Sequence, residues 1–451
     1  MTLAADSNLL AHFSDHLVQF HQRVGVTFQV ALKDDAGHIL VDVGEGFDDS
    51  VRQRVGDADY LDCIALDRPL TEEELFDDFH QLLSADQALA DFHERYGDLV
   101  LVKTALSRMG KQTAVMLQLA VLKLQLPLVY QQALFCSWLG VSLMNAMKRS
   151  SGDVYSAFFL AMVHDIGLLH VPMEYVKSRK RFQYRQLCVL HSHTVFGYNV
   201  LKRICNEPDE LLRAVAEHHE NLDGTGYPVG KVGNTICRFG QFLNFLDAVN
   251  AIYTKRLKPG QRPLRDLIPM IQMNGHSRFG IYGKKLIEWL KTMPEPKLRA
   301  VPNVLMPFLI QAVRDRHGYI SSCVDIMGQL SNDVGFRHGD SRVFALQNTV
   351  IHINISITQS GIINSAYMRW LDQVEAEGLV HAYREVEDVF LMMQEVIYHI
   401  GRLQNQIEYF LTTPCETQEA FKLKKGLERL ERVRIPKVHP NLEILWIASV
   451  H

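Results

Sequence analysis

The sequence predicts a mainly α-helical protein with a small α/β module at its N-terminal end. Two apolar patterns indicate helices: the stretch Ala157–Val163 is typical of a buried helix, and a series between residues 379 and 410 alternates steps of three and four. Two β-rich runs around an Asp/Gly turn indicate strands near the N-terminus. The expected regions are residues 1–110, 111–300 and 301–451.

The composition is that of a globular protein without a large excess of either charge. Apolar residues make up 47% of the 451 residues and charged residues 22%, and this length suggests more than one domain. The net charge of −4 argues against binding to DNA, which usually requires a basic excess. A local basic pocket for a small phosphate ligand is compatible with this balance.

The cysteines and the apolar runs indicate in which cellular compartment the protein is expected. The seven cysteines are scattered and never form C-x-x-C, so they predict neither a disulfide framework nor a cysteine zinc site. No signal peptide is evident, and the most apolar run, Ala114–Tyr130, is interrupted by polar residues and Pro127. We expect a cytoplasmic protein without a membrane span.

The N-terminal region reads as a small regulatory module. Residues 26–32 and 38–43 are β-rich, and Asp34–Gly37 between them predicts the turn of a hairpin. Further on, Thr71 and Glu74 have the spacing of a capping box at the start of a helix. We find no catalytic motif in this region.

The first candidate for chemistry is a His-Asp pair at the end of a predicted core helix. The apolar stretch ends in His164-Asp165, and Gly167 suits the C-terminus of that helix. Burying an imidazole beside a carboxylate is costly unless a partner satisfies both groups, and a metal ion does so well. Taken alone, the pair is a weak signal, and a structural role is the more common interpretation.

More histidines follow at helical positions. His193 lies beside an apolar stripe, and a helix predicted to begin after Pro208 ends in His218-His219. Apolar residues one turn behind these two histidines indicate that both face inward. The chain then turns through Asp223-Gly-Thr-Gly-Tyr-Pro228.

In order and spacing, these motifs resemble the HD-GYP family of metal-dependent phosphohydrolases. The resemblance rests on four groups of residues and fades outside roughly residues 111–300. The groups are His164-Asp165-Ile166-Gly167, His193 with Gly197, His218-His219-Glu220, and Asp223-Gly224-Thr225-Gly226-Tyr227-Pro228.

The resemblance implies an all-helical HD-type domain that holds iron or manganese ions and hydrolyses cyclic di-GMP to pGpG or GMP. In the family, Asp165 would be the catalytic bridge between two ions, and His164 would bind one of them. The other ion would take His193, His218 and His219. The Gly-Tyr-Pro loop would dock diguanylate cyclases of the GGDEF type through Asp223, Gly224, Gly226, Tyr227 and Pro228.

Three departures from the family pattern reduce the expected ligand set. The helix before the His-Asp pair carries Gln131 and Gln132 where the family has a histidine, and Asn244 stands in place of a metal-binding aspartate. Leu168 replaces the lysine that usually follows the His-Asp motif. We expect one ion to bind firmly and a second weakly or not at all. Gln131, Gln132 or Asp247 could replace a lost ligand.

Basic residues near these motifs could meet a substrate phosphate. A run between the His-Asp pair and His193 includes Arg181 and Arg185, and Arg238 matches a basic position common in the family. A basic run is also often a solvated face. Both interpretations remain open.

The apolar series in the third region predicts a long helix with one continuous apolar seam. Such a seam is typical of a helix in an intrachain bundle or of a coiled coil that forms a homodimer. The series comprises Leu379, Ala382, Val386, Val389, Met393, Val396, Ile400, Leu403, Ile407 and Phe410.

Two functions follow from these observations. The first is a metal-dependent phosphodiesterase acting on a cyclic dinucleotide, favoured by the complete set of His164, Asp165, His193, His218 and His219. The second is a catalytically impaired protein that senses a nucleotide or docks a diguanylate cyclase. The missing histidine, together with Asn244 and Leu168, favours the second.

Overall fold

The computed structural model is mainly α-helical, which confirms the predicted fold class. It describes residues 10–56, 58–178, 182–275, 279–294, 299–335, 340–412 and 418–445. Within these residues, the strands are short and confined to the N-terminal part of the chain.

Two compact units make up the chain, residues 1–219 with 236–247 and residues 220–235 with 248–451. Their limits differ from the boundaries expected near residues 110 and 300. The reason lies in packing, because helices on both sides of residue 110 contact one another within the first unit.

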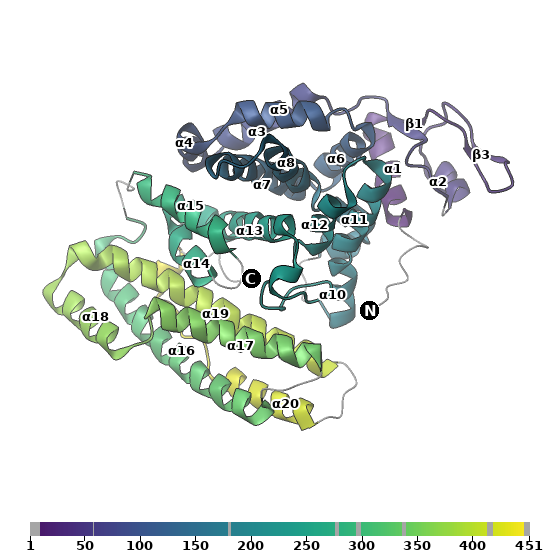
Figure 1. Ribbon diagram of the computed structural model, residues 1–451. Coiled ribbons are helices and arrows are strands. Elements are labelled where there is room, and N and C mark those ends of the chain that lie inside the picture. Colours follow the sequence, from purple (N-terminus) through teal and green to yellow (C-terminus); the bar gives the residue numbers. More distant parts are fainter. Residues whose placement is uncertain are drawn as a thin grey trace. The chain divides into compact units, whose positions relative to one another are not determined.

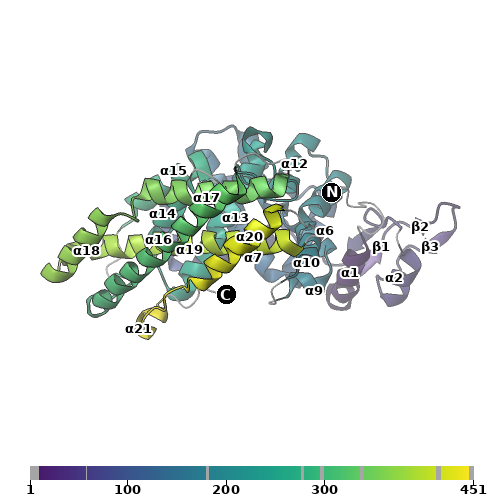
Figure 2. The ribbon, with the colours of Figure 1, turned by 90° about the horizontal axis from the view of Figure 1, so that it is seen from below.

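The N-terminal hairpin forms at the predicted Asp/Gly turn, but the prediction was wrong for residues 26–28, which pair elsewhere. β2 (Leu32–Lys33) pairs antiparallel with β3 (Ile39–Val41) across the Asp/Gly turn. β1 (Val26–Phe28) pairs instead with β4 (Ile64–Leu66), a partner distant in sequence. Helices α1 (Ala11–Val24) and α2 (Asp49–Val55) pack beside these strands (Figure 2).

The remaining helices of the first unit build one apolar core. The capping box predicted at Thr71 and Glu74 is confirmed at the start of α3. The helices are α1 (Ala11–Val24), α2 (Asp49–Val55), α3 (Glu72–Ser84), α4 (Gln87–Tyr96), α5 (Leu99–Met109), α6 (Thr113–Gln125), α7 (Pro127–Ala146), α8 (Ser151–Val163), α9 (Met173–Val176), α10 (Tyr184–His191), α11 (His193–Ile204), α12 (Asp209–Glu217) and the first part of α13 (Arg238–Ile252).

Helix α8 lies at the centre of this core. It packs against α5, α7 and α12, because apolar side chains cover its whole circumference (Figure 1). The segment Ser151–His170 is long and apolar enough to cross a membrane, but 78% of its apolar window is buried inside the protein. Such burial is typical of a core helix.

The second unit is a helical bundle. Short 3₁₀ and π segments connect α13 to it, and α19 packs against α14, α16, α17 and α20 (Figure 1). Its helices are α14 (Leu267–Met273), α15 (Gly280–Thr292), α16 (Met306–Val334), α17 (Ser341–Ser360), α18 (Ser365–Glu377), α19 (Tyr383–Thr412), α20 (Gln418–Arg432) and α21 (Pro440–Glu443).

The apolar seam of α19 packs against other helices of the same chain. Its side chains from Val386 to Phe410 are buried against helices of the same unit, as an intrachain bundle requires. The intrachain bundle is therefore the arrangement found for this seam, and a homodimer through the C-terminal helices stays a prediction.

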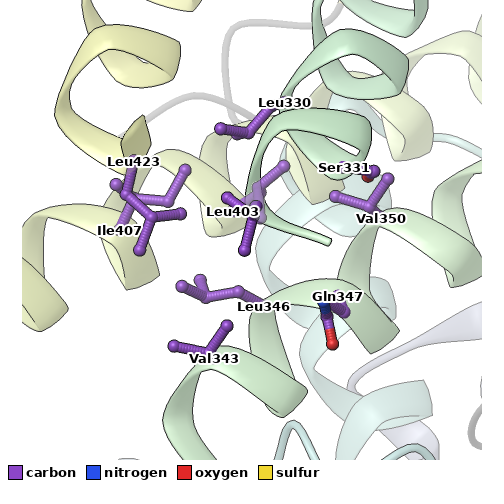
Figure 3. Close-up of a pocket in the computed structure, with 10 residues that line it drawn as sticks. Leu330, Ser331, Val343, Leu346, Gln347, Val350, Leu403, Ile407 and Leu423 are labelled. Atoms are coloured by element: carbon purple, nitrogen blue, oxygen red, sulfur yellow. The ribbon is translucent and has the colours of Figure 1, made fainter. Parts of the chain in front are cut away.

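A small pocket opens among α16, α17, α19 and α20 (Figure 3). Its lining is mostly aliphatic, and none of the lining residues belongs to the motifs that predict chemistry. The lining residues are Leu330, Ser331, Val334, Val343, Leu346, Gln347, Val350, Leu403, Ile407 and Leu423.

Candidate metal centre

The His-Asp pair lies at the C-terminal end of α8, as the sequence predicts. Ser150 caps the helix by accepting a 3.1 Å hydrogen bond from the amide of Asp153, and His164 ends it. Asp165 then begins a 3₁₀ turn. The side chains of His164 and Asp165 are 1% and 8% exposed, so both polar groups require partners inside the protein.

Two glycines bring the next ligand helix close to this turn. A Cβ atom at Gly167 would lie 1.9 Å from the carbonyl oxygen of His193, and one at Gly197 would touch Gly167 and Val215. Gly167 therefore allows a close backbone approach of α11, and it has no left-handed conformation of a helix cap. This corrects the capping role expected from the sequence.

Three histidine rings are oriented by the same backbone contact. The Nδ1 atoms of His164, His193 and His218 lie 2.8, 2.8 and 2.7 Å from the carbonyl oxygens three residues earlier. A carbonyl can only accept, so Nδ1 carries the proton and Nε2 presents a lone pair. Such outer hydrogen bonds are typical of histidines that bind metals.

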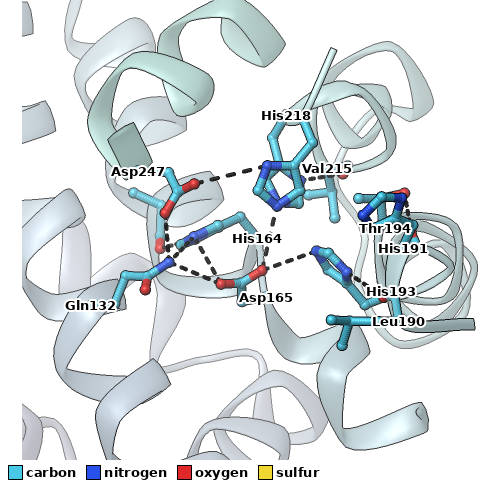
Figure 4. A network of polar contacts seen from close by, with 12 residues as sticks. Gln132, His164, Asp165, Leu190, His191, His193, Thr194, Val215, His218 and Asp247 are labelled. Carbon is cyan, nitrogen blue, oxygen red and sulfur yellow. Dashed lines mark hydrogen bonds and ion pairs between the residues drawn. The ribbon is translucent and has the colours of Figure 1, made fainter. Parts of the chain in front are cut away.

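All three Nε2 atoms point at the carboxylate of Asp165 (Figure 4). His193 and His218 lie 3.3 and 3.5 Å from its Oδ1 atom. His164 lies 3.3 Å from the Oδ2 atom. Lone pairs therefore face a negatively charged group, an arrangement that is repulsive unless a cation lies between them.

Four of the residues form a compact donor set for a metal ion. One ligand atom from each of Asp165, His193, His218 and His219 lies within 4.8 Å of the other three. The buried Asp165 Oδ1 and His218 Nε2 make no hydrogen bond to the described residues. Mixed imidazole and carboxylate donors suit iron, manganese or zinc, and these side chains fit such an ion.

Burial and charge set the protonation of the cluster. Burial by itself raises the pKa of Asp165, but the neighbouring His164, His193 and His218 outweigh it and hold this pKa well below its usual range. Burial lowers the pKa of His218 and lowers that of His219 strongly. These directions favour an ionised Asp165 beside neutral His218 and His219, the forms that bind metals.

The other side of Asp165 is occupied by a glutamine. The Nε2 atom of Gln132 lies 3.0 Å from Asp165 Oδ2 and 2.8 Å from Asp247 Oδ1. Gln131, which we predicted as a replacement ligand, is exposed instead. A step of one residue turns a helix by about 100°, so only one of these two neighbours faces the site.

Asn244 and Leu168 also depart from the family pattern. Asn244 is buried on α13, one turn before Asp247, whose Oδ2 atom lies 3.8 Å from Nδ1 of His219. Leu168 lies in the 3₁₀ turn that follows Asp165. The side chains of His219 and Asp247 are 20% and 17% exposed, so the site opens to solvent on their side.

The three arginines predicted to bind phosphate differ in their location and contacts. Arg181 lies outside the described residues, and Arg185 is exposed on α10. Arg238 forms an ion pair with Asp153 at the start of α8. Its charge is therefore already partly engaged within the first unit.

The Gly-Tyr-Pro loop is organised by Glu220, whose role the sequence motif did not reveal. Its buried carboxylate accepts hydrogen bonds from the amides of Val229, Gly230 and Lys231 at 2.7, 3.2 and 2.8 Å.

Among the predicted docking residues, Asp223 accepts from the amide of Thr225, and Gly224 has a left-handed φ of +77°. Gly226, Tyr227 and Pro228 span the remaining turn.

Gln132 and Asp247 were weighed from sequence as substitutes, but no sequence signal separated Gln132 from Gln131. The one sequence signal for the role of Glu220 was its position, because an acidic residue directly follows the predicted ligands His218 and His219. Three backbone amides around one carboxylate are a strong local constraint, and this carboxylate belongs to the residue directly after His219.

Comparison with known proteins agrees with this geometry. Residues 115–281 match the family model described as HD domain. A cyclic di-GMP phosphodiesterase of Thermotoga maritima is 28% identical over 139 residues, which cover 30% of this chain and 37% of that protein.

Two further relatives match over similar lengths. A 3'3'-cGAMP-specific phosphodiesterase of Vibrio cholerae is 26% identical over 26% of this chain and 25% of its own length. A cyclic di-GMP phosphodiesterase of Borreliella burgdorferi is 25% identical over 25% of this chain and 30% of its own length. The matches thus span less than two-fifths of each relative. The chain is thus similar to an HD domain over residues 115–281, and the relatives that it resembles are named as cyclic dinucleotide phosphodiesterases.

Proposed function

We propose that this chain is a metal-dependent phosphodiesterase that hydrolyses a cyclic dinucleotide, cyclic di-GMP to pGpG or GMP. One observation carries the proposal: Asp165, His193, His218 and His219 converge within 4.8 Å inside an HD domain. The names of the relatives support the substrate class. The donor set favours iron or manganese among the ions that such domains use.

The side chains divide the work of hydrolysis. A divalent ion held by this cluster would neutralise phosphate charge and lower the pKa of a coordinated water. The hydrogen bonds from Nδ1 to backbone carbonyls keep the rings of His193 and His218 aimed at one point. On the more open side, the carboxylate of Asp247 is available to accept a proton from an attacking water.

A second function is favoured by one specific observation. Gln132 and Asn244 provide neutral amides where the family pattern has charged or imidazole ligands. A weakened metal centre of this kind could retain nucleotide binding and lose turnover. The chain would then be a nucleotide sensor or a docking platform for a diguanylate cyclase of the GGDEF type.

Either function would belong to signalling in the bacterial cytoplasm, where the Gly-Tyr-Pro loop would bind a protein partner. Glu220 holds the Gly-Tyr-Pro loop in one conformation, and Val229 at its tip is 73% exposed. The amide of Asn348 on α17 also donates to the carbonyl oxygen of Asp223 at 2.5 Å, which supports the loop from the second unit's own bundle.

Product formation from cyclic di-GMP would separate the two functions. The protein would be purified anaerobically and supplied with Fe²⁺ or Mn²⁺, beside a His218→Ala, His219→Ala double variant and a His191→Gln control. His191 is a partly buried histidine outside the four-residue cluster. Turnover that survives in the control and disappears in the double variant or with chelator is expected. Folded protein that binds the nucleotide without turning it over with either metal would contradict the enzyme and leave the sensor.

A further inference from the structure

The amide group of Gln132 lies among acceptors. Its Nε2 atom is 3.0 Å from Asp165 Oδ2, 2.8 Å from Asp247 Oδ1 and 3.4 Å from His164 Nε2 (Figure 4). Two of these atoms belong to carboxylates, which accept when ionised. The third presents a lone pair, because Nδ1 of His164 donates to the carbonyl of Ala161.

The chemistry of these neighbours fixes which end of the amide faces them. An amide oxygen in this position would oppose two carboxylate oxygens and an imidazole lone pair without any hydrogen between them. The NH₂ group instead supplies two hydrogens and the positive end of a dipole. The atom between His164, Asp165 and Asp247 is therefore a donor, at a point where three potential metal ligands converge.

Charge balance gives a second, independent reason to expect a neutral donor there. The described side chains of the cluster supply two carboxylates, Asp165 and Asp247, and the imidazoles beside them bind a metal in their neutral form. One divalent ion neutralises these two charges. A second divalent ion would leave two uncompensated positive charges at a site whose deepest members are almost fully buried, which is costly.

We propose that the side-chain amide of Gln132 stands in for a second cation, so that this HD domain binds a single metal ion. The proposal rests on the proposed metal centre and adds which residue decides its stoichiometry. Gln132 holds Asp165 Oδ2 and Asp247 by hydrogen bonds, while Asp165 Oδ1 faces His193 and His218 for the one ion. Gln132 is a positioning residue, because it acts through Asp165.

Metal stoichiometry tests this inference without any assay of activity. The full chain would be loaded with Mn²⁺ and dialysed, and bound manganese per chain would be measured by elemental analysis. The expected value is one ion for the wild type and two for Gln132→Glu, which removes the donor and adds a negative ligand. Gln131→Glu is the matched control on the exposed neighbour, and we expect it to bind one ion.

Electron paramagnetic resonance provides a second readout. The wild type is expected to give the signal of an isolated Mn²⁺ ion, and Gln132→Glu the signal of a spin-coupled pair. Gln132→His offers a neutral ligand at the same position, if the added carboxylate prevents folding. Binding of a second ion should tighten at least tenfold in either variant.

The outcomes distinguish this inference from the function on which it rests. Two ions in the wild type, or one ion in both folded Gln132 variants, would overturn the role of Gln132 and leave the phosphodiesterase proposal standing. Folded wild-type protein that binds no ion would overturn the metal centre itself. One ion in the wild type and in Gln131→Glu, with two in a Gln132 variant, supports the inference.

Discussion

The two oxygens of Asp165 face different chemistry, although they belong to one carboxylate. Oδ1 faces lone pairs of His193 and His218, whereas Oδ2 accepts a hydrogen bond from Gln132 and lies near His164. The first side lacks a positive partner among the described side chains, and the second already has a donor. The His-Asp motif is common to both sides, so the neighbouring side chains decide where an ion is needed.

The largest expected effect compares one histidine from each side. His193→Ala should lower Mn²⁺ affinity by at least about a hundredfold, because it removes a direct donor, and even outer partners of metal ligands contribute about 10–100-fold. His164→Ala should lower it by about tenfold or less, since His164 faces the side that Gln132 occupies. Calorimetric titration with Mn²⁺ would measure both. Equal losses would break the distinction between the two sides.

The next effect concerns the close approach that brings α11 to Asp165. Gly167→Ala should destabilise the protein by about 1–3 kcal/mol, because its Cβ would overlap the carbonyl of His193 and the backbone must move. Metal affinity should fall as well, since His193 moves with that backbone. Thermal unfolding with and without Mn²⁺ would measure both quantities. Gly152→Ala, whose Cβ would meet only the Ser150 hydroxyl at 3.7 Å, is the control.

The protonation of the histidine side predicts a dependence of stability on pH. The pKa values of His218 and His219 are lowered in the folded chain, so their contribution is complete above the unfolded value near 6.5. Below that pH these two histidines bind protons in the unfolded state but stay neutral in the native state, so the free energy of unfolding falls. In chelator, unfolding of the wild type from pH 7.5 to 5.5 should show this loss.

His219→Gln should flatten that pH dependence by on the order of 1 kcal/mol across the range. An identical slope in the wild type and His219→Gln would mean that other buried histidines, such as His16 with a pKa lowered to about 4 by burial, dominate.

The smallest expected effect concerns Arg238. Its ion pair with Asp153 is half-exposed, so Arg238→Ala should change the free energy of unfolding by less than about 1 kcal/mol. If Arg238 also contacts a substrate phosphate, Asp153→Asn should release it and tighten nucleotide binding. Binding of cyclic di-GMP to both variants would decide. Unchanged affinity in both would leave Arg238 with a structural role alone.

The sequence predicted the elements of the site better than their contacts. Helical spacing and glycine positions indicated that the His-Asp pair, His193 and the His218-His219 pair end or begin helices, and the structure brings them together. The same reasoning did not decide between Gln131 and Gln132. Periodicity describes how residues are arranged around a helix, but it does not give the rotation of that helix against its neighbours.

Pairings distant in sequence were the other source of error. The partner of β1 is β4, and the partner of Arg238 is Asp153, 85 residues away. For β1 the sequence offered a nearer partner, the second strand of a hairpin, and for Arg238 it did not indicate the ion pair with Asp153. Local patterns cannot rank such partners, because their contact depends on how intervening helices pack.

By itself, the sequence determined the helical fold class, the HD motif and the kinds of donor atom available to a metal. These three properties follow from the types of residues and their spacing along the chain, which are local properties. Only the tertiary structure decided that Gln132 faces Asp165 and Asp247, that Glu220 holds the loop, and that the α19 seam is covered within the chain. These contacts join helices far apart in sequence, and their geometry comes from the packing of the core as a whole.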